Sequence, residues 1–172
     1  NWTCKVRAPG EATRYALDVF GEGDPLLSSN GADSSKGQFP AATPVHVKLG
    51  NSQNIIGAEV AGKVFRPDGS EVAITLFDDG DAAHGDELAQ DGIYSALFAD
   101  YVGAGDYLIS LQARGNANTQ FTTLNYRGDA AGGFEPGPTG PCPPFQRELN
   151  LLVSCLGNTG TGTGLLPLDD FE

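Results

Sequence analysis

The fold is decided by AEVAGKVFRPDGSEVAITLF, residues 58–77, which reads as two strands joined by a tight turn. Apolar residues alternate with polar or small residues on both sides of Arg66-Pro67-Asp68-Gly69, a sequence typical of a short hairpin connection. The apolar residues of the two halves form one inward stripe. The stretch therefore predicts a β-hairpin that buries one of its faces.

Other parts of the chain repeat this alternation, and they suggest four more strands: around Val45–Leu49, 93–100, around Tyr107–Leu111 and 121–127. Six short strands separated by Gly or Pro turns predict an all-β protein, an antiparallel β-sandwich of the immunoglobulin or fibronectin III kind. The segment 145–156 is ambiguous. Its apolar residues have helix-like spacing, but ELNLLVS within it would also serve as a strand.

The composition favours one main domain with appended segments. The chain has 172 residues, long enough for one substantial core, and its 24 Gly and 11 Pro suit many turns between short strands. Because there is no initiator Met or apolar leader, we expect a mature product or a piece of a longer chain. We predict four parts: two strands in 1–20, a linker or long loop in 21–38, the β-sandwich in 39–128 and an irregular Gly/Pro-rich extension in 129–172.

The charge of the chain limits its partners. A formal net charge of −12 argues against binding nucleic acid or anionic lipid, because both require a basic surface. No run of 18 apolar residues is present, so we expect no membrane span. Calcium, basic proteins and neutral glycans remain open as ligands.

The segment from Asp78 to Asp91 concentrates negative charge. It holds six carboxylates and no Lys or Arg. Two like charges about 5 Å apart repel by about 3 kcal/mol at an effective dielectric of about 20, so the loop needs either solvent or a cation. If calcium binds, Gly80, Gly85 and Gly92 would let the backbone fold around the ion, and the expected ligands are Asp79, Asp81, Asp86 and Asp91. The alternative is a solvated loop whose Asp-Gly pairs form ordinary turns.

The sequence gives no sign of catalysis, and we predict no catalytic residue. His46 lies on the polar face of a strand, where we expect it to be solvated. His84 lies among acids and is expected to compensate their charge rather than to bind zinc, because no second His or Cys stands at ligand spacing. No nucleophile elbow, zinc-protease motif or phosphate loop occurs.

Two covalent modifications are expected. Cys142 and Cys155 are close in the sequence and predict a local disulfide, which would leave Cys4 without a partner or paired with missing sequence. Asn1-Trp2-Thr3 fits the N-glycosylation pattern, so Asn1 is a candidate for a glycan; a chance match is the alternative.

Residues 57–115 resemble a secreted β-sandwich module found after von Willebrand factor A domains in bacterial surface proteins and in calcium-activated chloride channel regulators. The resemblance rests on Pro-Asp-Gly (67–69), Leu-Phe-Asp-Asp-Gly (76–80), Asp-Gly-Ile-Tyr-Ser (91–95) and Gly-Asp-Tyr (105–107). It implies a secreted or cell-surface location. Residues 1–20 are similar to the closing strands of the sandwich that precedes this module, so we expect them to dock on the main sandwich or on another chain.

The sequence therefore predicts a non-enzymatic extracellular module that connects other domains of a larger protein, with calcium as a structural cofactor if the loop binds it. One alternative is a subunit of a filament in which neighbouring copies exchange strands. Another is an adhesion module that binds a glycan or protein. It would require an exposed aromatic platform, built from residues such as Tyr94, Phe98, Tyr101 and Tyr126.

Overall fold

The computed structural model describes residues 25–30, 36–38, 41–51, 53–126 and 134–156, and all regular structure in these ranges is β. The first strands are β1 (Leu27–Ser29), β2 (Lys36–Gln38), β3 (Thr43–Leu49), β4 (Asn54–Ile56), β5 (Glu59–Phe65), β6 (Glu71–Leu76) and β7 (Ile93–Phe98). The remaining strands are β8 (Gly105–Arg114), β9 (Gln120–Thr122), β10 (Leu124–Tyr126), β11 (Phe134–Pro136), β12 (Gly140–Pro141) and β13 (Gln146–Leu156). None of the described residues forms a helix that could cross a membrane.

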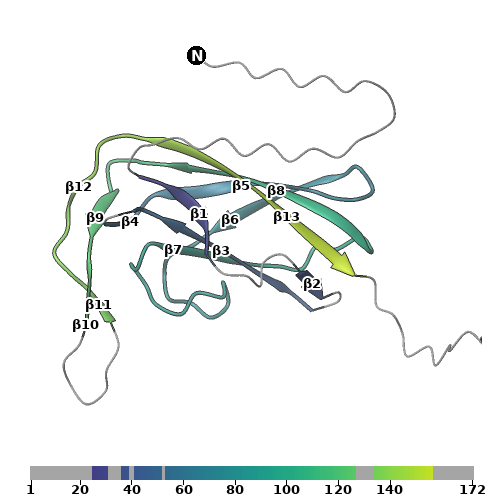
Figure 1. The fold of residues 1–172 in the computed structure, drawn as a ribbon, viewed down its shortest axis with the longest axis horizontal. Coiled ribbons are helices and arrows are strands. Elements are labelled where there is room, and N and C mark those ends of the chain that lie inside the picture. The colour runs from purple at the N-terminus through teal and green to yellow at the C-terminus, as the bar shows by residue number, and fades with distance from the viewer. Residues whose placement is uncertain (1–24, 31–35, 39–40, 52, 127–133, 157–172) are drawn as a thin grey trace, which may run out of the picture.

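Two sheets make up the body of the molecule (Figure 1). One has the order β1-β3-β7 and the other the order β2-β13-β8-β5-β6. Every pairing within them is antiparallel except the short parallel pairing of β2 with β13. This arrangement is that of an immunoglobulin-like sandwich, so the predicted fold class is confirmed. Smaller sheets, β12-β9-β4 and β10-β11, extend one end.

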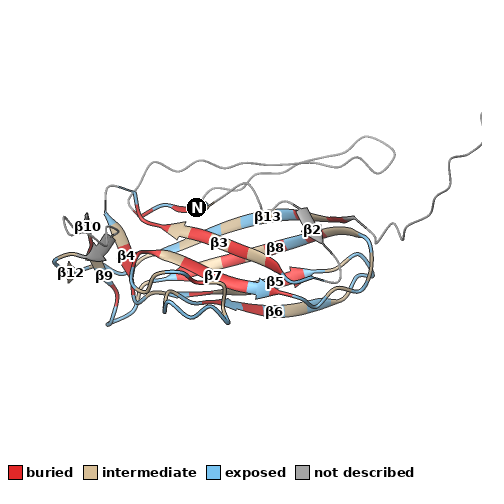
Figure 2. Ribbon diagram, turned by 90° about the horizontal axis from the view of Figure 1, so that it is seen from below, coloured by how far each residue is buried: buried red, intermediate tan, exposed pale blue. Residues whose placement is uncertain are grey.

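The core lies between the two sheets and follows from the alternation in the sequence (Figure 2). Val45, Val47 and Leu49 of β3 are fully buried, while the residues between them are only half-buried. On the facing sheet, Tyr107, Ile109 and Leu111 of β8 are buried in the same alternating way. Successive side chains of a strand point to opposite faces, so each strand contributes every second residue to the core.

Tyr107 fixes the connection that leads into β8. Its hydroxyl donates a hydrogen bond to the carbonyl of Gly103 at 2.6 Å and accepts one from the Val102 amide at 3.0 Å, while its ring is fully buried. A buried tyrosine that bonds back to the backbone a few residues upstream is the tyrosine corner of immunoglobulin-like domains. The sequence placed Tyr107 in a strand and in the Gly-Asp-Tyr motif, but it did not indicate these two bonds.

The predicted hairpin at 58–77 is present as β5 and β6. Val60 pairs with Leu76 and Phe65 with Glu71, and the Arg66 amide donates to the Ser70 carbonyl at 2.9 Å. Gly69 closes the turn with a φ of 84°, a conformation that favours glycine.

The segment 145–156 is strand β13, so its helical reading is wrong. Its inward residues include Val153 and Cys155, both buried, and Leu152 points outward and is 57% exposed. The outward leucine created the helix-like spacing. Because β13 pairs with β8 from Gln146 to Cys155, the predicted extension 129–172 contributes a strand to the larger sheet instead of being irregular throughout.

The predicted linker 21–38 also contains structure. β1 pairs with β3 and β2 pairs with β13, so a linker reading is wrong for these two short strands. Three-residue strands made mostly of Ser, Lys, Gly and Gln carry too little apolar periodicity to be recognised. The strands predicted in 1–20 lie outside the described residues.

Candidate functional site

The acidic loop, residues 78–92, connects β6 of the larger sheet to β7 of the smaller one (Figure 1). Phe77, just before it, forms a two-way backbone bridge with Ser95 of β7. The loop also packs against β7, because a Cβ added to Gly85 would lie 2.9 Å from a methyl carbon of Leu97. The loop is therefore attached to the outer face of β7 rather than projecting freely.

Asp78 joins the two ends of the acidic loop. Its Oδ1 accepts a hydrogen bond from the Asp91 amide and its Oδ2 one from the Gly92 amide, each at 3.1 Å. Asp91 in turn accepts from the Ile93 amide at 2.8 Å and is 8% exposed. Asp78 therefore holds the end of the loop against its start, and Asp91 caps the entry to β7.

Asp86 stabilises the middle of the loop from inside. It is 4% exposed, and its Oδ2 accepts a hydrogen bond from the Gly80 amide at 2.7 Å. Its own amide donates to the Asp81 carbonyl at 3.2 Å. Gly80 has a φ of 70°, and a Cβ there would lie 2.9 Å from the Ala89 amide nitrogen, so glycine allows the two arms of the loop to meet.

Asp79 and Asp81 lie on the exposed side of the loop and form local turns. Asp79 accepts from the Asp81 amide at 3.0 Å, and Asp81 accepts from the Ala83 amide at 2.8 Å. His84 Nδ1 lies 2.9 Å from Asp79 Oδ2, and the His84 ring stacks on Phe77 with centroids 4.1 Å apart. The Asp81 amide and, to a lesser degree, His84 hold the pKa of Asp79 below its ordinary value.

Burial changes the electrostatics at the base of the loop. Desolvation raises the pKa of Asp78 from 3.8 to about 7, against the lowering effect of its two amide donors, and the neighbouring Asp91 and Asp86 raise it further. Desolvation also raises the pKa of Asp91, with Asp86 again adding to the effect. The folded protein thus binds protons at Asp78 more tightly than the unfolded chain. The stability that protonated Asp78 contributes to the fold is fully present below about pH 4 and is lost as the pH rises through about 7.

The structure divides the four predicted calcium ligands into two pairs. Asp86 and Asp91 are buried at the base of the loop, whereas Asp79 and Asp81 are exposed and bonded within their own turns. Within the ranges that the structure describes, no group of three or more His, Cys, Asp or Glu residues is placed to hold a metal ion. Calcium binding stays a prediction. Sequence reasoning missed the role of Asp78, although its place directly after an apolar strand could have indicated its burial.

Three of the side chains named for an aromatic platform, Tyr94, Phe98 and Tyr101, do not form one. Tyr94 and Phe98 are 2% and 5% exposed and belong to the core. The Tyr94 hydroxyl donates to the Ile55 carbonyl at 3.1 Å, and Tyr101 packs edge-on against Phe98 with centroids 5.1 Å apart. Of this set, only Tyr126 has a side chain that lies outside the described part of the structure.

His46 and Ser95 are in contact, and by residue type alone they could be a general base and a nucleophile. Ser95 Oγ lies 3.2 Å from His46 Nδ1, so His46 is a hydrogen-bonded residue and not merely solvated. Ser95, however, is only 1% exposed beneath the connection that follows β6. A substrate carbonyl could not approach this hydroxyl, and the contact is structural.

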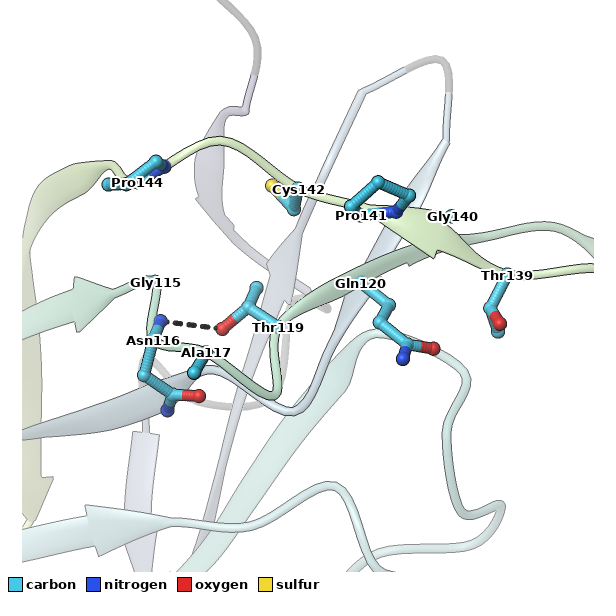
Figure 3. Close-up of a pocket in the computed structure, with 10 residues that line it drawn as sticks. All are labelled: Gly115, Asn116, Ala117, Thr119, Gln120, Thr139, Gly140, Pro141, Cys142 and Pro144. Atoms are coloured by element: carbon cyan, nitrogen blue, oxygen red, sulfur yellow. Dashed lines mark hydrogen bonds between the residues drawn. The ribbon is translucent and has the colours of Figure 1, made fainter.

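A surface groove lies between the β8–β9 turn and the segment around β12 (Figure 3). Its volume is about 500 Å³. The side chains that line it are short and uncharged, such as Asn116, Gln120, Thr139 and Cys142. Thr119 Oγ1 accepts a hydrogen bond from the Asn116 amide at 2.8 Å, which shapes one wall. The groove offers no acid, base or cation among these residues.

The predicted disulfide is not formed. Cys155 is buried near the end of β13, paired with Gly105, whereas Cys142 lies before β13 and its amide bonds to the Thr119 carbonyl. Cys155 is nine positions after Gln146 along the strand, a rise of roughly 30 Å, whereas bridged cysteines have Cα atoms roughly 5.5 Å apart. The disulfide was predicted from closeness in the sequence, and the extended strand β13 is what separates the two cysteines. Asn1 and Cys4 lie outside the described residues.

Known proteins resemble this chain over the described fold. Residues 35–123 match the family model for the conditioned medium factor second Ig-like domain. The calcium-activated chloride channel regulator 3A-1 of Mus musculus is 31% identical over 115 residues, which cover 66% of this chain and 12% of that protein. Regulator 1 of Equus caballus is 32% identical over 121 residues, covering 68% of this chain and 13% of that protein. No solved structure matches. The matched region is thus a small part of each relative.

Proposed function

Because the chain belongs to the conditioned medium factor second Ig-like domain family, we propose that it serves as a non-catalytic connecting module in a larger extracellular protein. The coverage of the relatives supports a module within a longer chain, since the matched regions are 12% and 13% of the two proteins. Immunoglobulin-like sandwiches host many unrelated functions, so the fold alone does not decide the role.

The path of the chain carries this proposal. The Pro25 carbonyl accepts a hydrogen bond at 2.6 Å from Arg147 Nε, which places the first described residues beside the start of β13. The last described residue, Leu156, is at the far end of the same strand. The described chain therefore enters and leaves at opposite ends of β13, roughly 30 Å apart. A module arranged in this way spaces the segments that flank it.

Force spectroscopy tests the connecting role. When the intact chain is pulled through handles at its two ends, the parallel β2–β13 pairing and the long β13–β8 pairing are loaded along their strands. We expect one cooperative rupture, at a higher force than in a control with the second handle at Gly140. Gradual extension at low force, or no difference from the control, would refute a load-bearing connector.

Calcium binding by the acidic loop is a second candidate function. Fewer acids would take part in it than the sequence indicated. Asp78 and Asp91 favour it, because desolvation by burial raises the pKa of both carboxyl groups and the nearby Asp86 adds to the effect. A cation near Asp78 or Asp91 would relieve the repulsion between the acids, and carboxylates with backbone carbonyls are suitable calcium ligands. Bound calcium would act on stability only.

Thermal unfolding of the intact chain at pH 5 and pH 8 tests this electrostatic account. In chelator, the melting temperature should be lower at pH 8 than at pH 5, because Asp78 and Asp91 then carry charge. If calcium binds, it should raise the melting temperature at pH 8 and raise it much less at pH 5. At a calcium concentration one hundred times Kd, the gain in the free energy of unfolding at pH 8 should be about 2.7 kcal/mol.

Two double variants serve as controls for the ion. Asp86→Ala with Asp91→Ala should abolish the calcium response, whereas Asp79→Ala with Asp81→Ala should keep it, because those two carboxylates are exposed. No response in the wild-type chain would refute calcium binding and leave the connecting role intact. Strand exchange in a filament and adhesion to a glycan or protein remain alternatives; nothing in the contacts described above favours either.

A further inference from the structure

The chain contains three Asp-Gly pairs, which are places where an aspartate rearranges readily. Because glycine has no side chain, the preceding carboxyl carbon can reach the next amide nitrogen with little hindrance. A glycine amide that is hydrogen-bonded is held away from this reaction, so each pair reacts only as fast as its surroundings open. All three glycine amides donate such a bond: Gly69 to the Arg66 carbonyl, Gly80 to Asp86 Oδ2 and Gly92 to Asp78 Oδ2.

The pair Asp91-Gly92 depends on a more distant acceptor than the other two pairs. The Gly69 amide bonds within its own hairpin turn, and the acceptor of Gly80 is six positions away. The acceptor of Gly92 is Asp78, fourteen positions away at the opposite end of the acidic loop, with a bond of 3.1 Å. Opening of the loop at its base therefore releases the Gly92 amide even while the two sheets stay folded.

The Asp91 side chain is also held away from the Gly92 nitrogen. Its Oδ1 accepts a hydrogen bond from the Ile93 amide at 2.8 Å, which directs the carboxylate toward the residue beyond Gly92. Asp91 and Gly92 are both buried. The closed loop thus restrains both reacting groups, the amide nitrogen and the carboxyl carbon.

We propose that Asp91-Gly92 is a latent isomerisation site, which the hydrogen bond from the Gly92 amide to Asp78 keeps unreactive. When the base of the loop opens, the Gly92 nitrogen attacks the Asp91 carboxyl carbon. A new N–C bond forms, the C–OH bond of the carboxyl group breaks, and the hydroxyl leaves as water with the amide proton, which gives a cyclic imide. Water then opens the ring at the former main-chain carbonyl, so that the chain continues through the side-chain carbonyl as isoaspartate. The water lost in the first step is regained in the second, and no oxidant or reductant takes part.

Isomerisation at this pair would lengthen the main chain by one carbon atom where β7 begins. The Gly92 carbonyl accepts a hydrogen bond from the Leu49 amide at 2.9 Å, and Ile93 pairs with Lys48 of β3. The space around the glycine is also full, because a Cβ on Gly92 would lie 2.8 Å from Asn54 Cβ. The lengthened chain therefore cannot restore both the bond to Leu49 and the register of β7. The inference does not depend on calcium or on the connecting role.

Peptide mapping of the intact chain, aged at pH 5 in chelator, tests the proposal. A protease that cleaves before aspartate but not before isoaspartate measures the initial rate of conversion at residue 91, and a free peptide of residues 86–95 gives the unprotected rate. The wild-type chain should convert more slowly than the peptide. Asp78→Ala should convert about tenfold or more faster than the wild type, because the Gly92 amide has lost its acceptor. Asp68 in the same molecules should keep its wild-type rate, because the Gly69 amide bonds elsewhere.

Two further variants distinguish local opening from general instability. Asp81→Ala removes an exposed carboxylate from the same loop and should convert at the wild-type rate. Val64→Ala weakens the buried core at β5 without changing the loop, so any acceleration should appear at Asp68 and Asp91 alike, because global unfolding exposes both pairs. The proposal is overturned if the wild-type chain converts at the peptide rate or if Asp78→Ala converts no faster than the wild type. Equal acceleration of Asp68 and Asp91 in Asp78→Ala would overturn it as well, because global unfolding would then be the cause.

Discussion

Replacing Gly62 with valine is expected to prevent the larger sheet from forming correctly and to lower the free energy of unfolding by more than about 3 kcal/mol. Gly62 lies in β5 between Leu111 of β8 and Ile74 of β6. A Cβ at this position would overlap the Ser110 carbonyl oxygen and lie 2.9 Å from Leu111 Cα. Because both obstacles are backbone atoms of the neighbouring strand, the strand pair itself must shift.

Chemical denaturation with a matched variant distinguishes this effect from a general loss of strand propensity. Ala61→Val changes the neighbouring residue, which shares the outward face of β5 with Lys63, and should alter stability by less than about 1 kcal/mol. If Gly62→Val unfolds at the same denaturant concentration as Ala61→Val, the described approach of β5 to β8 is wrong.

Replacing Asp78 with alanine is expected to lower the free energy of unfolding at pH 5 by about 2 to 4 kcal/mol, because two amides at the base of the acidic loop lose their acceptor. These amides belong to Asp91 and Gly92, both of which are buried. At pH 8 the loss should be smaller. The wild-type protein has then already lost the stability that a protonated Asp78 provides, since burial raises the pKa of this group to about 7.

Urea unfolding at both pH values measures this difference. Asp81→Ala removes a carboxylate from the same loop, but one that is exposed and bonds only to the nearby Ala83 amide, so it should cost no more than about 0.5 kcal/mol. Equal losses in the two variants would mean that Asp78 does not anchor the loop.

The sequence predicted the features that depend on strong local patterns. The hairpin of β5 and β6 was predicted correctly because apolar alternation on both sides of a Pro-Asp-Gly turn is typical of a β-hairpin. The sandwich followed from repetition of the same pattern, and the acidic loop was found from its composition. His84, which the sequence placed among the acids, does contact one of them: its Nδ1 lies 2.9 Å from Asp79 Oδ2.

The missed features depend on tertiary contacts. β13 looked ambiguous because Leu152 points outward, and its role as a partner of β8 is set by a segment more than thirty residues earlier. Likewise, composition does not indicate which acids a loop buries. Asp78 and Asp86 differ from the exposed Asp79 and Asp81 because of the folded backbone. Its amides at Gly80, Asp91 and Gly92 donate to the first two carboxylates.

These contacts give the acidic loop an architectural role. Five of its aspartates accept hydrogen bonds from amides of the same connection or of the strand that follows it. Carboxylates used in this way shape the crossing from β6 to β7, and those at its base carry an electrostatic cost that protonation, or a cation, would relieve. The same arrangement buries Ser95 on the outer face of β7, whereas Leu97 on that face is 42% exposed.

The most direct test of this account is amide exchange at Asp91 and Gly92 at pH 5 in the absence of calcium. If Asp78 closes the loop as described, both amides should be as strongly protected as those between β3 and β7, and Asp78→Ala should release both. Exchange of these two amides at the rate of an unstructured peptide in the wild-type chain would contradict the central claim that the acidic loop is part of the folded framework.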